Sequence, residues 1–323
     1  MQMQMQTQGA LAANRDTVEN SRIVKLIFYV RDLAISRAFY EDSLNLELLQ
    51  SDEQSADYDT GQIILCLERK AVQDGAVPRR DRSADLTFLV EDLVGTRDAL
   101  VSQGVQMTET LRYEIGATVD FFDPDGHWIS LYEPSAGAMT WPSSEKLKAV
   151  IRASGGNPDA YGSSAGPAGP VESRLKGCAV VYLFTFIPDP DAAFHFYNGV
   201  LGLNYLECRP CRRGTTENAR GVVKYDTGGL MLTTHYRDVP EQGDETVAHL
   251  QCVTPVFHVA DVRAVAANLA QNGINSTPPT LGRDGLISTF GDSFGRNFQL
   301  LETAVGGRTP VQVKIENIVA AKL

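Results

Sequence analysis

The chain repeats its own motifs, and this repetition constrains the fold more than any other feature. The first copy consists of Val30-Arg31-Asp32-Leu33, Phe39-Tyr40 and Leu44-Asn45-Leu46. The second copy consists of Ile187-Pro188-Asp189-Pro190, Phe196-Tyr197 and Leu201-Gly202-Leu203. Weaker copies begin at Val90-Glu91-Asp92-Leu93 and at Val259-Ala260-Asp261-Val262. Four similar stretches in two pairs indicate an internal duplication, so we expect repeated supersecondary modules.

Each repeat opens with a pattern that is typical of a half-buried strand. In the first repeat the apolar residues Leu26, Phe28 and Val30 alternate with their neighbours, as the period of a strand requires. The Asp that follows is a preferred residue at the start of a helix. Phe39-Tyr40 and Phe196-Tyr197 fall at helical spacings, and we expect them to pack in the core.

Turn residues separate three further strands in each repeat. Gly-containing turns occur at Asp59-Thr60-Gly61 and Asp226-Thr227-Gly228-Gly229. The clearest turn is Asp123-Pro124-Asp125-Gly126-His127, which precedes a strand from Trp128 to Glu133. The pattern therefore predicts the order β-α-β-β-β for each repeat.

The pattern V-x-D-x-x-x-S-x-x-F-Y-x-x-x-L at Val30–Leu44 and the D-P-D-G-H turn resemble the vicinal oxygen chelate superfamily. This superfamily holds glyoxalase I, bleomycin-resistance proteins and extradiol dioxygenases. The resemblance covers nearly the whole chain, and the four modules most resemble the extradiol dioxygenases. It implies an α+β fold in which four βαβββ modules pair into two cup-shaped domains. Active sites of the family lie in the concave faces, and one fold supports many chemistries.

The repeats predict the domain boundaries. We expect a flexible tail over residues 1–20 and a first domain over 21–135, composed of modules 21–80 and 81–135. A linker over 136–174, with a short helix at Glu145–Ala153 and a Gly/Ser/Pro-rich stretch at Gly155–Pro170, precedes the second domain. That domain covers 175–305, with modules 175–240 and 247–305. A C-terminal extension covers 306–323.

Composition excludes several classes of partner. A net charge of -11 argues against a nucleic-acid partner, because phosphate binding requires clustered Lys and Arg. No apolar stretch approaches the roughly 18 residues that span a bilayer. Five scattered cysteines indicate a reducing cytoplasm, and we interpret Cys208-x-x-Cys211 as incidental. We expect a cytoplasmic protein that is a monomer or a homodimer and that binds a small molecule.

The resemblance also shows where family metal ligands would lie. They occupy the seventh position before each helix-starting Asp and a position shortly after each turn glycine. These positions hold Lys25, Ile64, Asp85, Ser130, Tyr182, Met231, Thr254 and Gln299. A divalent ion needs several converging His or carboxylate groups, and among these residues only Asp85 qualifies. We therefore predict no metal and no cofactor, and we expect Lys25 and Asp85 to form a structural ion pair.

Strand alternation predicts which side chains face the cups. In the second domain, His258, Tyr182 and Gln299 are candidate catalytic residues, because His can move a proton while Tyr and Gln donate to an oxyanion. The alternative for His258 is a satisfied side chain near the sheet edge. The candidate substrate-binding residues are Phe184, Phe186, Met231, Thr233, His235, Thr254, Asn297, Tyr29, Trp128 and Tyr132.

Three functions are compatible with these features. The preferred hypothesis is a metal-independent isomerase, lyase or cyclase that acts on an aromatic or secondary-metabolite-like substrate. A protein that sequesters a drug or metabolite, of the bleomycin-resistance type, is the first alternative. The second is a metal-dependent extradiol dioxygenase or glyoxalase whose ligands lie elsewhere.

Overall fold

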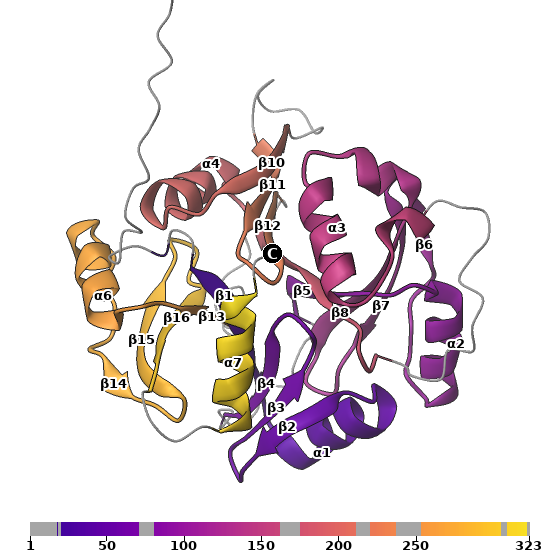
Figure 1. Ribbon diagram of the computed structural model, residues 1–323, viewed down its shortest axis with the longest axis horizontal. Coiled ribbons are helices and arrows are strands. Elements are labelled where there is room, and N and C mark those ends of the chain that lie inside the picture. Colours follow the sequence, from indigo (N-terminus) through magenta and orange to yellow (C-terminus); the bar gives the residue numbers. More distant parts are fainter. Residues whose placement is uncertain are drawn as a thin grey trace, which may run out of the picture.

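The chain forms two mixed sheets of eight strands each (Figure 1). The computed structural model describes residues 18, 21–70, 81–161, 175–210, 220–236, 253–304 and 309–321. Sheet A has the strand order β14-β15-β16-β13-β1-β4-β3-β2. Sheet B has the order β10-β11-β12-β9-β5-β8-β7-β6. Each sheet contains two of the repeats, which confirms the α+β class with modules paired into cups.

The first two repeats have the predicted order of one strand, one helix and three strands. The first contains β1 (Arg22–Val30), α1 (Leu33–Ala38), the π-helical turn η1 (Phe39–Ser43), β2 (Glu47–Ser51), β3 (Ser55–Asp59) and β4 (Ile64–Arg69). The second contains β5 (Asp81–Leu89), α2 (Leu93–Ser102), β6 (Leu111–Tyr113), β7 (Gly116–Phe122) and β8 (His127–Pro134).

The last two repeats have the same order. The third contains β9 (Val180–Ile187), α4 (Pro190–Phe194), the π-helical turn η4 (His195–Val200), β10 (Tyr205–Pro210), β11 (Arg220–Asp226) and β12 (Met231–Tyr236). The fourth contains β13 (Val253–His258), α6 (Val262–Gln271), β14 (Thr280–Leu281), β15 (Gly285–Gly291) and β16 (Asn297–Thr303).

The repeats do not pair in the order in which they occur along the chain. Strand β1 pairs antiparallel with β13, and β5 pairs antiparallel with β9. Sheet A therefore joins the first repeat to the fourth, and sheet B joins the second to the third. The prediction that repeats adjacent in sequence share a cup is wrong. The four opening strands have similar patterns, so the pattern alone does not select a partner.

Aspartates begin the four helices of the repeats, as predicted. The side chains of Asp32, Asp92, Asp189 and Asp261 accept hydrogen bonds from backbone amides of the first turn. These bonds satisfy amides that have no partner within the helix.

A central core joins the two sheets and contains the aromatic pairs. Tyr40 and Tyr197 are fully buried, which confirms the predicted core packing. Their hydroxyls donate to Asp123 and Asp292 respectively, each at 2.9 Å. Asp123 belongs to the D-P-D-G-H turn and lies 2.7 Å from Nδ1 of His127. The turn is therefore tied to the core by buried hydrogen bonds.

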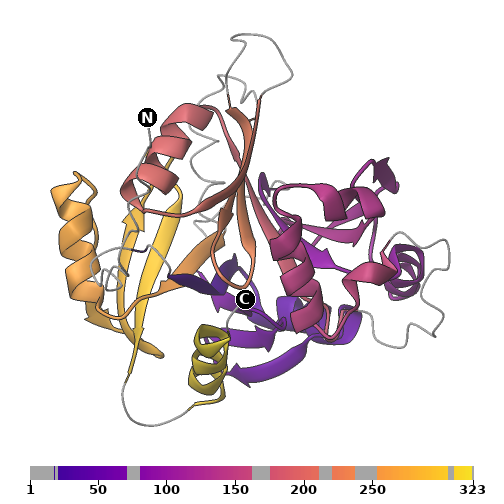
Figure 2. The same ribbon diagram turned by 45° about the horizontal axis from the view of Figure 1, so that its top comes forward.

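Two helices outside the repeats pack against the concave faces (Figure 2). The predicted linker helix is present as α3 (Ser144–Ala153), flanked by the 3₁₀ turns η2 (Ala136–Thr140) and η3 (Pro158–Ala160). The C-terminal extension, to which the sequence assigned no secondary structure, forms α7 (Pro310–Ala320). Helix α3 packs in one apolar cluster with Tyr182 and Met231 of sheet B, and α7 packs with Val24 and Val256 of sheet A.

Within the described part of the chain, every helix is too short or too polar to span a lipid bilayer. Cys66, Cys178 and Cys208 are free thiols, whereas Cys211 and Cys252 lie outside the described residues. The predicted tail over residues 1–20 also lies almost entirely outside them, as do residues 162–174 of the linker.

Candidate functional site

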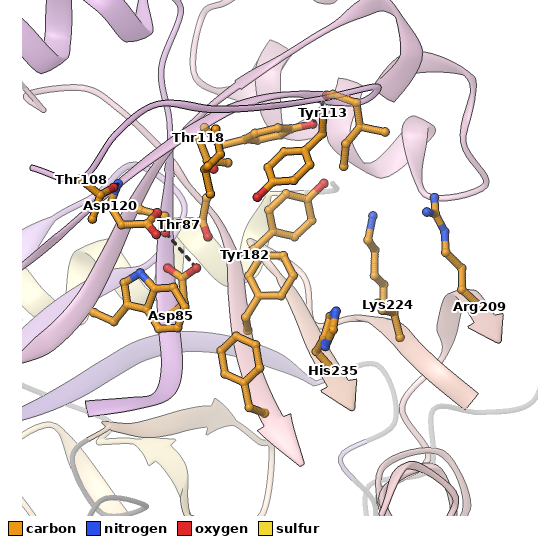
Figure 3. A pocket seen from close by; sticks show the side chains of 18 of the residues that line it. Asp85, Thr87, Thr108, Tyr113, Thr118, Asp120, Tyr182, Arg209, Lys224 and His235 are labelled. Carbon is orange, nitrogen blue, oxygen red and sulfur yellow. Dashed lines mark hydrogen bonds between the residues drawn. The ribbon is translucent and has the colours of Figure 1, made fainter. Parts of the chain in front are cut away.

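The concave face of sheet B, which we call cup B, surrounds a cavity of about 590 Å³. This volume is typical of a pocket for a small molecule, and such pockets combine an apolar wall with a few polar groups. Figure 3 shows Asp85, Thr87 and Asp120 gathered on one side, with Lys224 and Arg209 on the other. The aromatic side chains that line the cavity include Tyr113, Phe122, Trp128, Tyr132, Trp141, Tyr182, Phe184 and Phe186.

A row of registered residues connects the two polar sides of cup B. Lys224 on β11 lies opposite Thr233 on β12, and Thr233 lies opposite Phe184 on β9. Phe184 in turn lies opposite Asp85 on β5. Three strand spacings of about 4.8 Å place Lys224 and Asp85 about 14 Å apart along the sheet. The sheet therefore presents an acid and a cation from one row, with an aromatic ring between them.

The acidic side of cup B contains two carboxyl groups joined by one hydroxyl. Ser130 Oγ lies 2.9 Å from Oδ2 of Asp85 and 2.8 Å from Oδ1 of Asp120. A serine hydroxyl has one proton, so it donates to only one of them. The second contact becomes a hydrogen bond when one of the two carboxyl groups is protonated and donates to Ser130. This geometry therefore suits a pair of carboxyl groups that share one proton.

Burial favours the protonated form of Asp85. The loss of solvation, and after it the charge of Asp120, raise the pKa of this carboxyl to about 8, although the hydroxyls of Ser130 and Thr87 oppose the shift. Oδ1 of Asp85 has no hydrogen-bond partner among the residues that the structure describes. A carboxyl with a pKa near neutrality can accept and return a proton under ordinary conditions.

The basic side of cup B is built around Lys224. Its Nζ donates to Ser143 Oγ at 3.0 Å and lies 3.5 Å from Oε2 of Glu207. Ser143 donates to the same carboxylate at 2.7 Å, and Arg209 forms an ion pair with its other oxygen. Burial lowers the pKa of Lys224, although the charge of Glu207 opposes this shift. The ammonium also lies 5.2 Å from the ring centroids of Trp141 and Tyr182.

The concave face of sheet A, which we call cup A, differs in its contents. Its cavity of about 430 Å³ is lined by charged side chains that pair with each other. Lys25 Nζ lies 3.1 Å from Oδ1 of Asp57 and 2.5 Å from Oδ2 of Asp284. Arg283 forms ion pairs with Asp57 and, at 3.3 Å, with Asp52. The charges of cup A are thus largely engaged within the protein.

The structure separates the three candidate catalytic residues. Tyr182 lines cup B, whereas Gln299 lines cup A. His258 is half-buried on β13 in sheet A, where its Nε2 lies 2.8 Å from Thr303 Oγ1 and burial lowers its pKa. A single site formed by these residues is therefore a wrong prediction, because it assumed that the third and fourth repeats share a cup.

The ion pair predicted between Lys25 and Asp85 is also wrong. The two residues lie in different sheets, Lys25 on β1 and Asp85 on β5. Lys25 pairs with Asp57 and Asp284 instead. Each of the two residues does face a cup, Lys25 in sheet A and Asp85 in sheet B. Strand alternation thus predicted the direction of both side chains correctly, but not which residue each would pair with.

The predicted substrate-binding residues divide between the two sheets. Five of them line cup B, namely Trp128, Tyr132, Phe184, Phe186 and His235. Met231 and Thr233 lie on the same sheet but are fully buried, and Met231 packs in the cluster that contains α3. Tyr29, Thr254 and Asn297 lie in sheet A, where the hydroxyls of Thr254 and Tyr29 are 3.4 Å apart.

Several residues of cup B were not predicted from the sequence. Asp120, Glu207, Arg209 and Lys224 lie on the middle strands of their repeats, for which no cup-facing residues were assigned. The alternation of Glu207 with Arg209, and of Val222 with Lys224, is a period-2 signal that identifies these faces. Trp141 lies between η2 and α3, where no strand pattern exists.

The fold and these motifs agree with comparisons to known proteins. The chain belongs to the Glyoxalase/Bleomycin resistance protein/Dioxygenase superfamily, whose family model matches residues 22–131 and 179–300. It is 29% identical over 181 residues to Metapyrocatechase 2 of Cupriavidus necator. That match covers 54% of this chain and 50% of the relative, so the chain spans about half of the relative's length.

Solved structures show the same fold at low sequence identity. A "putative dioxygenase" from Bacillus subtilis superposes with a TM-score of 0.59 at 13% identity, covering 96% of this chain and 92% of that one. Glyoxalase I from Zea mays superposes with a TM-score of 0.54 at 14% identity, covering 93% of this chain and 95% of that one. At these identities the likeness concerns the fold alone.

The residues of this chain do not fit the metal centre that the resemblance implies. In cup B the corresponding positions hold Asp85, Ser130, Tyr182 and Met231, a set with a single carboxylate. In cup A the ammonium of Lys25 lies among the carboxylates. Across the described ranges, no three His, Cys, Asp or Glu side chains are placed to share an ion. Divalent metals in proteins require such convergence.

Proposed function

We propose that the protein binds a planar aromatic molecule in cup B and transfers a proton on it through Asp85. The observation that carries the proposal is the Ser130 hydroxyl held between the carboxyl groups of Asp85 and Asp120, at 2.9 and 2.8 Å, inside an aromatic cavity. The chemistry is of the isomerase, lyase or cyclase type, and it uses side chains of the protein alone.

The proposed step moves one proton each way. The ionised form of Asp85 removes a proton from carbon or oxygen of the bound molecule. The neutral acid then returns a proton to another atom of the same molecule, so the carboxyl ends in its starting state. Ser130 holds the carboxyl in place, and burial together with the charge of Asp120 keeps the pKa of Asp85 near neutrality. His258 takes no part, because it belongs to sheet A.

Exchange of carbon-bound hydrogen provides a direct test. We expect the protein to accelerate exchange of the α-protons of 1-tetralone, an aromatic ketone, in deuterated buffer, as followed by proton NMR. Asp85→Asn should slow this exchange at least about 100-fold, the usual contribution of a general base. Asp120→Asn should lower the pH midpoint of the exchange, because the Asp120 charge raises the pKa of Asp85. Equal exchange rates in wild type and Asp85→Asn contradict the proposal.

Sequestration without reaction is a second candidate, supported by the aromatic wall. Trp128 and Phe186 stack with ring centroids 5.5 Å apart and planes inclined by 7°. Such a surface favours the face of a flat ligand. Binding of aromatic molecules by a protein that exchanges no protons on them would favour this candidate.

A further inference from the structure

The two polar sides of cup B have opposite character, and this difference selects among aromatic ligands. Asp85 and Asp120 make one side acidic, whereas Lys224 and Arg209 make the other basic. A ligand with a negative charge is repelled from the first side and attracted to the second. The cavity therefore distinguishes the two ends of a bound molecule.

Positive charge exceeds negative charge on the basic side. Glu207 is the carboxylate that pairs with both Lys224 and Arg209, so two cations share one anion among the described residues. Lys224 Nζ is 3.5 Å from Glu207, a longer contact than a normal hydrogen bond. Within the part of the chain that the structure describes, one unit of positive charge thus has no matching carboxylate at this end of the cavity.

The ammonium of Lys224 also retains donor capacity. It has three N–H groups, of which Ser143 accepts one at 3.0 Å. Lys224 is only 6% exposed, and a buried ammonium is costly unless it is paired. The ring centroids of Trp141 and Tyr182 lie 5.2 Å from it, and all three side chains line the cavity.

We infer that the ligand of cup B is an aromatic carboxylate whose anionic group pairs with Lys224 while its ring system extends toward Asp85. This inference rests on the proposed function, because it assumes that cup B holds an aromatic molecule. The row from Lys224 to Asp85 is about 14 Å long, and the inward reach of both side chains shortens the distance that a ligand must bridge. Two fused rings with a carboxylate match this distance.

Intrinsic fluorescence provides the test, because both tryptophans of the chain, Trp128 and Trp141, line cup B. The probes are 2-naphthoate and its neutral isostere 2-naphthamide, titrated separately while tryptophan quenching is recorded. We expect wild type to bind 2-naphthoate at least tenfold more tightly than 2-naphthamide. Lys224→Met should abolish this preference by weakening the binding of 2-naphthoate at least tenfold, whereas Lys224→Arg should retain the preference.

Matched variants separate this inference from the proposed function. Lys148→Met makes the same substitution on the surface of α3, where Lys148 pairs with Glu145, and it should leave the preference intact. If Lys224→Met does not fold, Lys224→Gln replaces it. Equal binding of both probes by wild type overturns the anion assignment but leaves aromatic binding in place. If neither probe quenches the tryptophan fluorescence, both the anion assignment and the proposed binding of aromatic molecules in cup B are overturned.

Discussion

Cup A and cup B are built from the same repeat, but their charged side chains have different partners. In cup A, Lys25 contacts both Asp57 and Asp284, and Arg283 contacts Asp57 as well. In cup B, Asp85 and Lys224 lie on opposite sides of a cavity of about 590 Å³. The comparison teaches that one sheet architecture can use its inward charges for internal pairing or leave them for a ligand.

The helices that cover the two cups differ in a similar way, because the polar residue at the start of α7 bonds within its helix and the one at the start of α3 does not. Helix α7 begins with a capping box in which Thr309 and Gln312 bond reciprocally to each other's backbone. Helix α3 begins after Ser143, whose hydroxyl makes no capping bond. That hydroxyl instead contacts Lys224 and Glu207. In cup B, Ser143 at the N-terminus of α3 therefore bonds to residues of the site and does not cap the helix.

The largest expected effect concerns the ionisation of Asp85. Its folded pKa of about 8 lies above its usual value of 3.8, so the native state binds more protons than the unfolded state between these values. Stability should therefore fall as pH rises from about 4 to 8, by on the order of 5 kcal/mol, and stay level above pH 8.

Asp85→Asn should remove this slope, because the amide is neutral at every pH. Urea unfolding of both proteins between pH 5 and pH 9 measures the difference. The variant should be the more stable protein at pH 9. If the stabilities of wild type and Asp85→Asn changed with pH in parallel, Asp85 would ionise as an ordinary carboxyl. Cup B would then lack the uncompensated buried carboxyl that distinguishes it from cup A.

Lys25→Met should destabilise the protein by about 3–5 kcal/mol, because it leaves two buried carboxylates, Asp57 and Asp284, with Arg283 in place of two cations. The same substitution at Lys224 should cost less, since it leaves one carboxylate, Glu207, with Arg209. Denaturant unfolding at neutral pH compares the two variants. Equal losses would contradict the idea that cup A depends more on internal ion pairs than cup B does.

Truncation of a buried isoleucine in each covering helix comes next. Ile315→Ala in α7 and Ile151→Ala in α3 should each cost about 2–5 kcal/mol, because both side chains are fully buried. Only Ile151→Ala should also weaken binding of 2-naphthoate, because Ile151 belongs to the cluster that contains Tyr132 and Tyr182. Weaker binding in both variants would indicate that cup A also influences the ligand.

The smallest effect concerns the two helix starts. Thr309→Ala should reduce stability by about 1 kcal/mol through loss of the capping box, and Thr309→Ser should restore most of it. Ser143→Ala removes no cap, so it should change stability less while reducing the preference for 2-naphthoate over 2-naphthamide. A preference that is unchanged in Ser143→Ala would separate Ser143 from the ligand site.

The sequence predicted the modules well because each repeat carries local signals. Strand alternation, Asp32 and its three equivalents at helix starts, and the turn at Asp123–His127 each depend on neighbours along the chain. Partner choice between opening strands depends on the packing of the whole molecule, and similar patterns do not reveal it. The prediction therefore identified Asp85 as facing a cup but assigned Lys25 as its partner.

The candidate site was predicted only in part, for the same physical reason. Trp128 and Phe184 lie on opening or closing strands, where alternation is easily aligned with the repeat. Lys224 lies on a middle strand, and Trp141 lies outside all strands, so the approach of Lys224 to Trp141 and to Tyr182 follows from tertiary structure alone.

The pairing of β1 with β13 has a consequence for how the molecule is assembled. During synthesis, β1 leaves the ribosome long before β13 has been made. The edge of β1 that pairs with β13 therefore stays unpaired until late in synthesis. Each sheet contains strands from both halves of the chain. Cleaved between the halves, the protein should yield two fragments that complement one another when mixed, and neither fragment holds a complete cup by itself.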